Sequence, residues 1–550
     1  MSLEHMFMQE SRFAEPDEVY GLLDEINLED SCFSGGLPVY SDGRTVWVDG
    51  SDSNSLIVAG PGSGKSRRIA VPLILSDGAA GYSMVINDPK GELVRFTSDY
   101  LKTKGYAVKT VNFREPGSDQ WNPLYYGAKL FASGNEDLAC EAFCEVAECL
   151  YNPVNSTDDP FWTIAASNMF VGYALLACQI VEPEQVTIPL VYSLFIDGSK
   201  QLGGTTYINE YFRHYGTPII EQAMAGILDS PHETKASINA VFTSVISRLV
   251  INKQINEMLS GNSFEPLDFV EKKTALFIVS KDESSVYRPL VSLLIDELYI
   301  RLVNEAEKGN GALPKNVDFI FDEFSNMTKI PDFHAKVSAC RSRGIRMHLF
   351  VQTLSQTEIV YGPAISRTIM ACCDDWVIFH SPEIEMLKLF SERCGFYETQ
   401  YTNMRRPLLA PSQLQRFSKE KGEALFLIDR LFPFISCLPD KSVYDKALGI
   451  SELSHIPHGR QRKHEPFVFS FREFIERARN AEMEKMLAEA ESGEGNPRIR
   501  YGQRSNLPLE LIMKKMDMKI MQMEKENKKK NGHRENKITE EPMPVSEAFQ

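Results

Sequence analysis

The chain has 550 residues, of which 43% are hydrophobic and 24% are charged, and its formal net charge is −16. This length is too great for one simple core and predicts two or three domains. The acidic balance excludes a protein that coats nucleic acid with its whole surface. A local basic channel stays compatible with it, because clustering rather than total charge sets the field that phosphates feel.

Cysteine usage and hydropathy restrict the protein class further. None of the 10 cysteines has a spacing typical of zinc sites, so we expect free thiols in a reducing compartment. No apolar stretch reaches the ~18 uninterrupted residues that a membrane span requires. The nearest, Met169 to Val181, is too short and predicts a buried core helix.

The first elements in chain order predict an α/β fold. Residues 1–50 form an acidic segment ending in two β-prone runs around a Ser-Asp-Gly turn, which indicates a hairpin. A strand, a glycine-rich turn and a helix follow over residues 56–75, and the sequence YSMVINDPKGEL then holds a second buried strand. This is a βαβ unit. We assign residues 51–130 to the first part of a nucleotide-binding domain.

The rest of the chain divides into three parts. Helical patterns dominate residues 131–262 and predict an inserted all-α domain, with Phe161 and Trp162 in its core. Over residues 263–450 short β-rich runs such as TALFIVS and RMHLFVQ return, typical of a parallel sheet buried on both faces, and form the second part of the nucleotide-binding domain. Residues 451–550 predict one charged amphipathic helix and a disordered tail, with a binding tail as the alternative.

The glycine-rich turn AGPGSGKS, from Ala59 to Ser66, fits the Walker A pattern of P-loop proteins. Its glycines allow backbone N–H groups to point at phosphate, and the following helix adds the positive end of its dipole. Lys65 is expected to reach the β- and γ-phosphates of ATP, and the Ser66 hydroxyl to bind Mg²⁺. The alternative is a chance glycine-rich turn. The predicted nucleotide-binding residues are Gly60, Pro61, Gly62, Ser63, Gly64, Lys65 and Ser66.

A second acidic element is expected beside this turn, and the sequence VDFIFDEF supplies it. There an apolar strand ends in Asp322 and Glu323. We expect Asp322 to hold Mg²⁺ through water and Glu323 to polarise the water that attacks the γ-phosphate. Alone, such a pair is equally typical of a capped strand end. Together with the Walker A turn it favours an ATPase motor over a G protein.

Two further residues complete the predicted catalytic set. Gln352 ends the next strand, RMHLFVQ, where an amide can sense the γ-phosphate, although glutamine also commonly caps strand ends. Arg341 and Arg343 precede that strand without an obvious partner in the local sequence. Arg341 in particular is a candidate arginine finger that completes a neighbouring subunit's site. The alternatives are a surface arginine or a phosphate contact to nucleic acid.

Several segments, taken in order, resemble the TraG/TraD family of type IV secretion coupling proteins. They are GLPVYSDGRTVWV, LIVAGPGSGKSRR, INDPKGELVRFTSDYLKTKGYAVKTVNF, WNPL, PFW, FIFDEFSNM and RSRGIRMHLFVQTLSQ, and they span roughly residues 35–445. DPKGEL with the later WNPL is far more specific than Walker A. Lys90 of DPKGEL has two open roles, a contact that supports phosphate binding or a salt bridge.

The resemblance implies a RecA-like P-loop domain in a ring ATPase, usually a hexamer, at the inner face of the cell membrane. It implies ATP-driven passage of single-stranded DNA and its attached relaxase into a type IV secretion channel, with the inserted helical domain meeting the relaxosome. The residues that match the family's catalytic set by position are Lys65, Ser66, Asp322, Glu323, Gln352 and Arg341.

The chain departs from the family pattern in one respect, and two other functions compete. Family members generally carry an N-terminal membrane domain that this chain lacks, so we expect either its removal or recruitment by a separate membrane subunit. The first alternative function is an FtsK/HerA-like DNA pump outside conjugation, against which the DPKGEL and WNPL segments and the helical insert argue. The second is a substrate receptor whose nucleotide only switches assembly.

Overall fold

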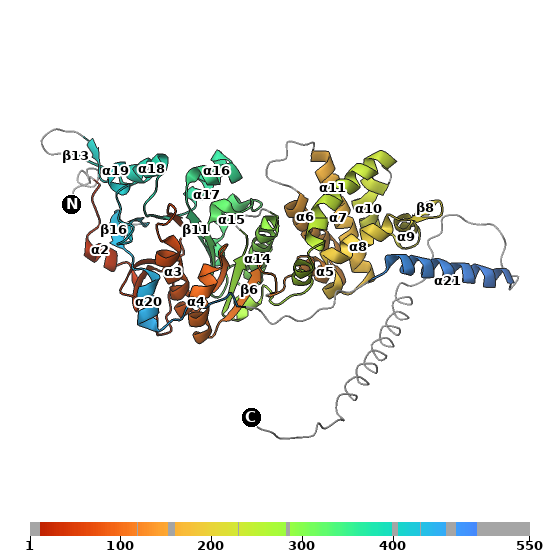
Figure 1. Cartoon of the computed structure of the whole chain (residues 1–550), viewed down its shortest axis with the longest axis horizontal. Coiled ribbons are helices and arrows are strands. Elements are labelled where there is room, and N and C mark those ends of the chain that lie inside the picture. The colour runs from red at the N-terminus through yellow and green to blue at the C-terminus, as the bar shows by residue number, and fades with distance from the viewer. Residues whose placement is uncertain are drawn as a thin grey trace, which may run out of the picture.

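The computed structural model describes residues 11–117, 119–151, 160–228, 230–281, 286–398, 405–429, 431–457 and 469–491 (Figure 1). A nine-stranded sheet forms the centre of the α/β part, in the spatial order β16-β15-β12-β4-β11-β10-β5-β9-β6. Its strands are β4 (Ser55–Val58), β5 (Ser83–Asn87), β6 (Ala107–Asn112), β9 (Thr274–Val279), β10 (Val317–Asp322), β11 (Ile345–Val351), β12 (Asp375–Ile378), β15 (Glu423–Leu427) and β16 (Phe434–Cys437).

The order and direction of these strands confirm the predicted RecA-like α/β fold. All neighbours from β12 to β6 are parallel, whereas β15 and β16 are antiparallel additions at one end. The Walker A turn follows β4, and the acidic pair lies at the end of β10. Only β11 separates these two strands. Because parallel strands end at the same edge of a sheet, the two elements meet there.

Both faces of the sheet are covered, as its apolar strands require. In β4, Leu56 and Val58 belong to one hydrophobic core, and Ile57 with the following Ala59 belongs to the other. The second core is covered by α3 (Val71–Ala80), α4 (Glu92–Thr103) and α20 (Lys441–Leu448). The first is covered by α14 (Arg288–Lys308), α15 (Phe333–Ala339), α16 (Leu354–Tyr361), α17 (Pro363–Ala371) and α18 (Ile384–Cys394).

A small N-terminal sheet packs on the same face as α3. It contains β1 (Asp24–Asn27), β2 (Leu37–Ser41) and β3 (Thr45–Asp49), preceded by α2 (Pro16–Tyr20), and antiparallel β2 and β3 confirm the predicted hairpin. Arg346 of β11 joins this segment to the large sheet. Its buried guanidinium donates to the Gly35 and Ser51 carbonyl oxygens at 3.1 Å and pairs with Asp318 and Asp77. The ion network therefore fixes the N-terminal segment against the large sheet.

A helical region lies beside the β6 edge of the sheet (Figure 1). It contains α5 (Tyr125–Ala132), α6 (Glu136–Tyr151), α7 (Pro160–Ile180), α8 (Ile188–Gly198), α9 (Tyr207–Tyr215), α10 (Pro218–Leu228), α11 (His232–Val250) and α12 (Lys253–Met258), with a short hairpin of β7 (Gln201–Leu202) and β8 (Thr205–Thr206). The hairpin departs from the all-α expectation. The short helix α13 (Asp268–Glu271) leads back into β9.

Helix α7 is the central helix of this region. Its 21 residues and mean hydropathy of 1.4 would suffice for a membrane span by length and composition. However, 56% of its apolar window is buried inside the protein, where it packs against α6, α8, α10 and α11. This is the burial of a core helix. Phe161, at its first turn, is 50% exposed, so the prediction that it lies in the core is wrong, whereas Trp162 is partly buried.

The remaining described elements lie towards the C-terminus. They are β13 (Phe396–Glu398), β14 (Arg405–Pro407), α19 (Pro411–Leu414) and α21 (Phe471–Glu491). Helix α21 runs along the helical region (Figure 1), where the rings of Phe471 and Tyr211 lie 5.6 Å apart and Tyr207 donates to Glu476 at 2.6 Å. The predicted disordered tail falls outside the described residues.

The WNPL segment forms the junction between the two regions. The Trp121 backbone N–H donates to the Met258 carbonyl at 2.9 Å, and its indole donates to the Glu297 carboxylate of α14 at 2.8 Å. Asn122 donates to the Val186 carbonyl at 2.8 Å. Burial raises the pKa of Glu297 to about 7. The segment therefore ties the beginning of the helical region to its end and to α14, which covers one face of the sheet.

Candidate active site

The glycine-rich turn leads directly from β4 into a helix that begins with a π-helical turn, Ser66–Ala70, and continues into α3. Gly62 and Gly64 have φ values of 69° and 83°. This left-handed backbone costs other residues about 1–2 kcal/mol. The Ser63 hydroxyl is buried and has no hydrogen-bond partner among the described residues. A phosphate-binding turn requires polar groups that have no partner within the protein, and the Ser63 hydroxyl is such a group.

The predicted Walker residues come together at the carboxyl edge of the sheet. The Lys65 ammonium lies 3.1 Å from Asp322 Oδ1 and 3.8 Å from Glu323 Oε1, and all three side chains are almost fully buried. The Ser66 hydroxyl donates to the Asp322 carboxylate at 3.1 Å. Lys65 makes no hydrogen bond within the described part of the chain, although it is close to both acids. A lysine, a hydroxyl and a carboxylate in contact fit a triphosphate with Mg²⁺.

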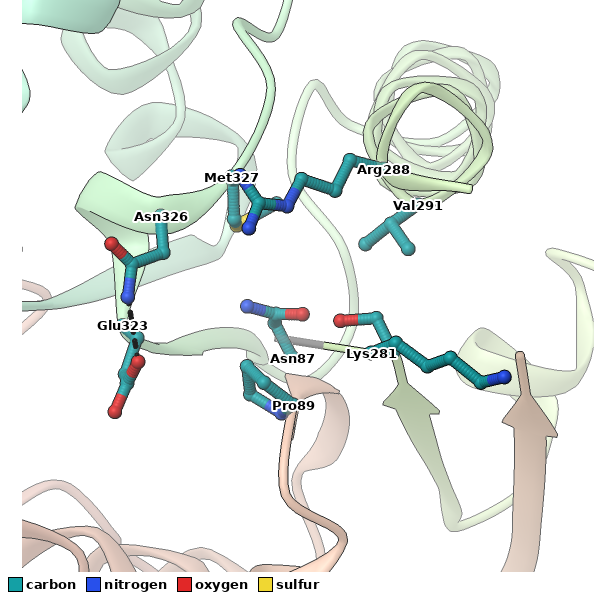
Figure 2. Close-up of a pocket in the computed structure, with 9 residues that line it drawn as sticks. Asn87, Pro89, Lys281, Arg288, Val291, Glu323, Asn326 and Met327 are labelled. Atoms are coloured by element: carbon teal, nitrogen blue, oxygen red, sulfur yellow. Dashed lines mark hydrogen bonds between the residues drawn. The ribbon is translucent and has the colours of Figure 1, made fainter. Parts of the chain in front are cut away.

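Glu323 is held in an unusual backbone conformation with both carboxylate oxygens engaged. Its φ of 82° is in the left-handed region, which non-glycine residues adopt rarely. Oε1 lies 3.1 Å from the Lys90 ammonium, and Oε2 accepts a hydrogen bond from Asn326 at 2.7 Å (Figure 2). Burial raises the pKa of Glu323, but the ammonium groups of Lys65 and Lys90 outweigh it and lower the pKa overall. The carboxylate is therefore ionised.

The DPKGEL segment forms the turn that places Lys90 on Glu323. Asp88 accepts backbone hydrogen bonds from Glu92 at 3.1 Å and Val94 at 2.9 Å, which caps the start of α4. Burial, followed by the charge of Asp322, raises the pKa of Asp88 to about 7. Of the two roles left open for Lys90, the described geometry is that of the salt bridge, and its partner is the predicted catalytic base.

Gln352 follows β11 directly, at the carboxyl end of the strand between β4 and β10. It is partly buried. It is thus at the edge of the sheet that carries the Walker A turn and Asp322, and its role as a γ-phosphate sensor stays a prediction.

Arg341 lies at the opposite edge of the sheet, before β11 begins. Its guanidinium is 3.0 Å from Asp52 Oδ1 and also pairs with Asp374. The expectation of an arginine without a nearby partner is therefore wrong, because Asp52 and Asp374 precede the neighbouring strands β4 and β12. The side chain is nevertheless 40% exposed. Arg343 donates to the Ala339 carbonyl at 3.0 Å.

Two residues of this edge were not predicted from the sequence. Asn87 ends β5 and is 1% exposed, and neither of its amide atoms has a partner within the described residues. Its position could have been predicted, because a polar residue at the carboxyl end of a parallel strand is typical of a binding site. Asn326 had no such signal, because its contact with Glu323 depends on the left-handed turn at that residue.

Comparison with known proteins identifies the family. Residues 15–421 match the family described as Type IV secretory system conjugative DNA transfer. The coupling protein TraD of Escherichia coli (strain K12) is 22% identical over 323 residues, which cover 56% of this chain and 42% of TraD. The chain thus spans less than half the length of this curated relative.

Solved structures of the plasmid coupling protein TrwB share the fold. TrwB in complex with ADPNP has a TM-score of 0.56 and 14% identity, and the superposition covers 79% of this chain and 94% of TrwB. TrwB in complex with ADP and Mg²⁺ has a TM-score of 0.55 and 15% identity, covering 84% and 97%. The family match spans well over half of the chain, and the protein belongs to the type IV secretory system conjugative DNA transfer family.

Proposed function

We propose that this chain is an ATP-driven motor that moves single-stranded DNA, with its relaxase, into a type IV secretion channel. The observation that supports this best is the contact of Lys65 and Ser66 with Asp322, because Ser66 and Asp322 are 256 residues apart in the sequence. The TrwB structures with ADPNP and with ADP and Mg²⁺ make a nucleotide the natural ligand for the same fold. Family membership supports DNA as the cargo.

Each predicted site residue has a role in ATP hydrolysis under this proposal. The Lys65 ammonium, already buried beside acids, would turn to the β- and γ-phosphates. The Ser66 hydroxyl and the Asp322 carboxylate would hold Mg²⁺, which when bound neutralises charge on the phosphate oxygens. The ionised Glu323 carboxylate would accept a proton from the attacking water. Gln352 would sense the γ-phosphate and relay its loss along β11.

Arg341 would act on a neighbouring copy of the chain. Its own Walker A turn lies at the carboxyl edge of the sheet, whereas Arg341 lies at the amino edge with Asp52 and Asp374. An arginine on the far edge cannot reach the phosphates of its own subunit, but in a closed ring it can face the next subunit. We therefore propose a ring, a homo-hexamer by analogy with the family, in which Arg341 is the finger.

The proposed partners are the relaxosome and the secretion channel. The helical region beside the sheet is the proposed contact for the relaxase–DNA complex. We place the ring in the cytoplasm at the inner face of the membrane, attached through channel components or a separate membrane subunit.

ATP turnover by purified protein, with and without single-stranded DNA, tests the proposal. We expect turnover stimulated by DNA, and a loss of about 100-fold or more in Lys65→Ala and in Glu323→Gln. Arg44→Gln, on the exposed turn of the β2–β3 hairpin, serves as a control with unchanged turnover. Specific relaxase binding without any turnover would contradict the motor and favour a receptor whose nucleotide only switches assembly.

A further inference from the structure

A small pocket of about 20 Å³ adjoins Glu323, the predicted catalytic base (Figure 2). It lies at the carboxyl ends of β5, β9 and β10, and Asn326 and Met327 form one wall. The nucleotide residues Lys65, Ser66 and Asp322 do not line it. The pocket therefore lies beside the cluster of Walker residues rather than within it, and the proposed hydrolysis mechanism gives it no role.

Asn87 is the strongest indication that this pocket binds a ligand. The side chain is 1% exposed, and both its amide nitrogen and its amide oxygen lack hydrogen-bond partners among the described residues. In Figure 2 the amide extends into the pocket. Leaving a buried amide unsatisfied costs about 1–3 kcal/mol. A ligand that accepts a hydrogen bond from this amide would remove that cost.

The other groups around Asn87 favour an anion. Arg288 begins α14, and its guanidinium extends into the same space as the Asn87 amide (Figure 2). Val291, in the first turn of this 21-residue helix, also lines the pocket, so the positive end of the helix dipole borders it. Lys281 lines the rim. Glu323, the acid among the described lining residues, is already paired with Lys90.

The chemistry of the lining selects a phosphate group. A guanidinium and a helix amino end are groups that bind phosphate oxygens, and an amide adds a neutral donor. None of the described residues that line the pocket is aromatic, so stacking of a base there has no support. A motor that moves any sequence must hold the backbone, and each nucleotide of the strand carries one phosphate.

We infer that this pocket binds a phosphate group, and that in the working motor the group is a backbone phosphate of the transported strand. The inference rests on the proposed function. It also connects the strand to hydrolysis, because Asn326 lines the pocket and donates to Glu323 at 2.7 Å. A phosphate in the pocket competes with the Glu323 carboxylate for this amide. Strand binding would thus release the catalytic base.

Binding of a fluorescein-labelled oligothymidine, measured by anisotropy over a series of potassium chloride concentrations, tests the site. We expect Arg288→Gln and Asn87→Leu each to weaken binding by about tenfold. Because Arg288→Gln removes a cation from a phosphate, the slope of log K against log salt should fall by about 0.7 in this variant. Asn87→Leu removes a neutral donor and should leave the slope unchanged. The matched control is Arg44→Gln, a 57%-exposed arginine on the hairpin turn.

Each other outcome overturns the inference in a distinguishable way. Wild-type affinity and slope in both variants would show that the strand does not use this pocket. If the variants bind oligothymidine normally but lose product inhibition by inorganic phosphate, the pocket holds the released phosphate. If they lose only affinity for polyglutamate, it takes an acidic protein segment. Failure of the wild-type protein itself to bind oligothymidine would remove the proposed function as well.

Discussion

Truncation of Asn326 to alanine is expected to raise ATP turnover in the absence of DNA. The Asn326 amide donates to Glu323 Oε2 at 2.7 Å, and the Lys90 ammonium holds the other carboxylate oxygen at 3.1 Å. With both oxygens engaged, the carboxylate is not available to a water on the γ-phosphate. The alanine side chain leaves Oε2 without this donor and makes the carboxylate available more often.

The size of the effect follows from the type of bond that is removed. A hydrogen bond to a charged group contributes about 1.5–3 kcal/mol, and each 1.4 kcal/mol is a tenfold change in an equilibrium constant. Part of this is recovered by water at the exposed side, so we expect basal turnover by Asn326→Ala to rise by up to about tenfold. Turnover with DNA should stay close to wild type, and the stimulation factor should fall accordingly.

A steady-state ATPase assay at saturating ATP, with and without oligothymidine, measures both rates. Asn209→Ala, at an exposed asparagine on α9, is the matched control and should behave as wild type. Lower basal turnover in Asn326→Ala, with the same KM for ATP, would refute the reasoning. It would mean that the amide orients Glu323 for catalysis rather than restraining it.

Three further predictions concern the turn, the junction and the ring. Gly64→Ala should weaken binding of a fluorescent ATP analogue by about tenfold or more, and Gly62→Ala should weaken it by less. Both glycines adopt left-handed φ, but only a Cβ at Gly64 would meet a neighbour, Arg68 at 3.1 Å. Equal affinities of the two variants would contradict this prediction. Burial raises the Glu297 pKa from 4.5 to about 7. Between pH 4.5 and pH 7 the native state therefore binds more protons than the unfolded state. The free energy of unfolding consequently falls as pH rises through 7. The melting temperature of Glu297→Gln relative to wild type should therefore rise between pH 5 and pH 8, and a constant difference would exclude the raised pKa. Finally, the Arg341→Ala and Glu323→Gln variants are each expected to be inactive. If Arg341 acts on the neighbouring subunit, mixing them should restore ATP turnover, because an Arg341→Ala subunit keeps Glu323 and its Glu323→Gln neighbour supplies Arg341. A mixture without ATP turnover would contradict a role of Arg341 in the neighbouring site.

The cluster of Walker residues was predictable because local sequence patterns mark both the Walker A turn and the acidic pair. The Walker A turn needs glycine at Gly62 and Gly64, and an apolar strand with an acidic end is recognisable without a structure. Parallel strands then bring the end of β4 and the end of β10 to one edge. The helical region was likewise predicted from local sequence, because helical patterns dominate residues 131–262.

The contacts of Arg341 and Glu323 were not predictable from the sequence. The partners of Arg341 are remote in the sequence, and the contact of Glu323 with Asn326 depends on one backbone angle. The partners of Arg341, Asp52 and Asp374, lie 289 and 33 residues away along the chain. Nothing in the local sequence links either to Arg341. The bond from Asn326 to Glu323 requires the left-handed φ of Glu323, which residue preferences argue against. Strained positions of this kind are where sequence rules fail at functional sites.

The different partners of the two Glu323 carboxylate oxygens indicate an order for the release of this carboxylate under the proposed function. On the nucleotide side, the Lys65 ammonium lies 3.8 Å from the carboxylate, and binding of ATP would draw that ammonium towards the phosphates. At the other carboxylate oxygen, Asn326 would stay bonded until a phosphate of the strand competes for its amide. Lys90 remains on the carboxylate in both steps and keeps it ionised. The two restraints act on different oxygens of the carboxylate. Under the proposed function, ATP alone would therefore remove one of them, and hydrolysis would wait for the strand. Such an arrangement would prevent a motor of this family from consuming ATP when no DNA is engaged.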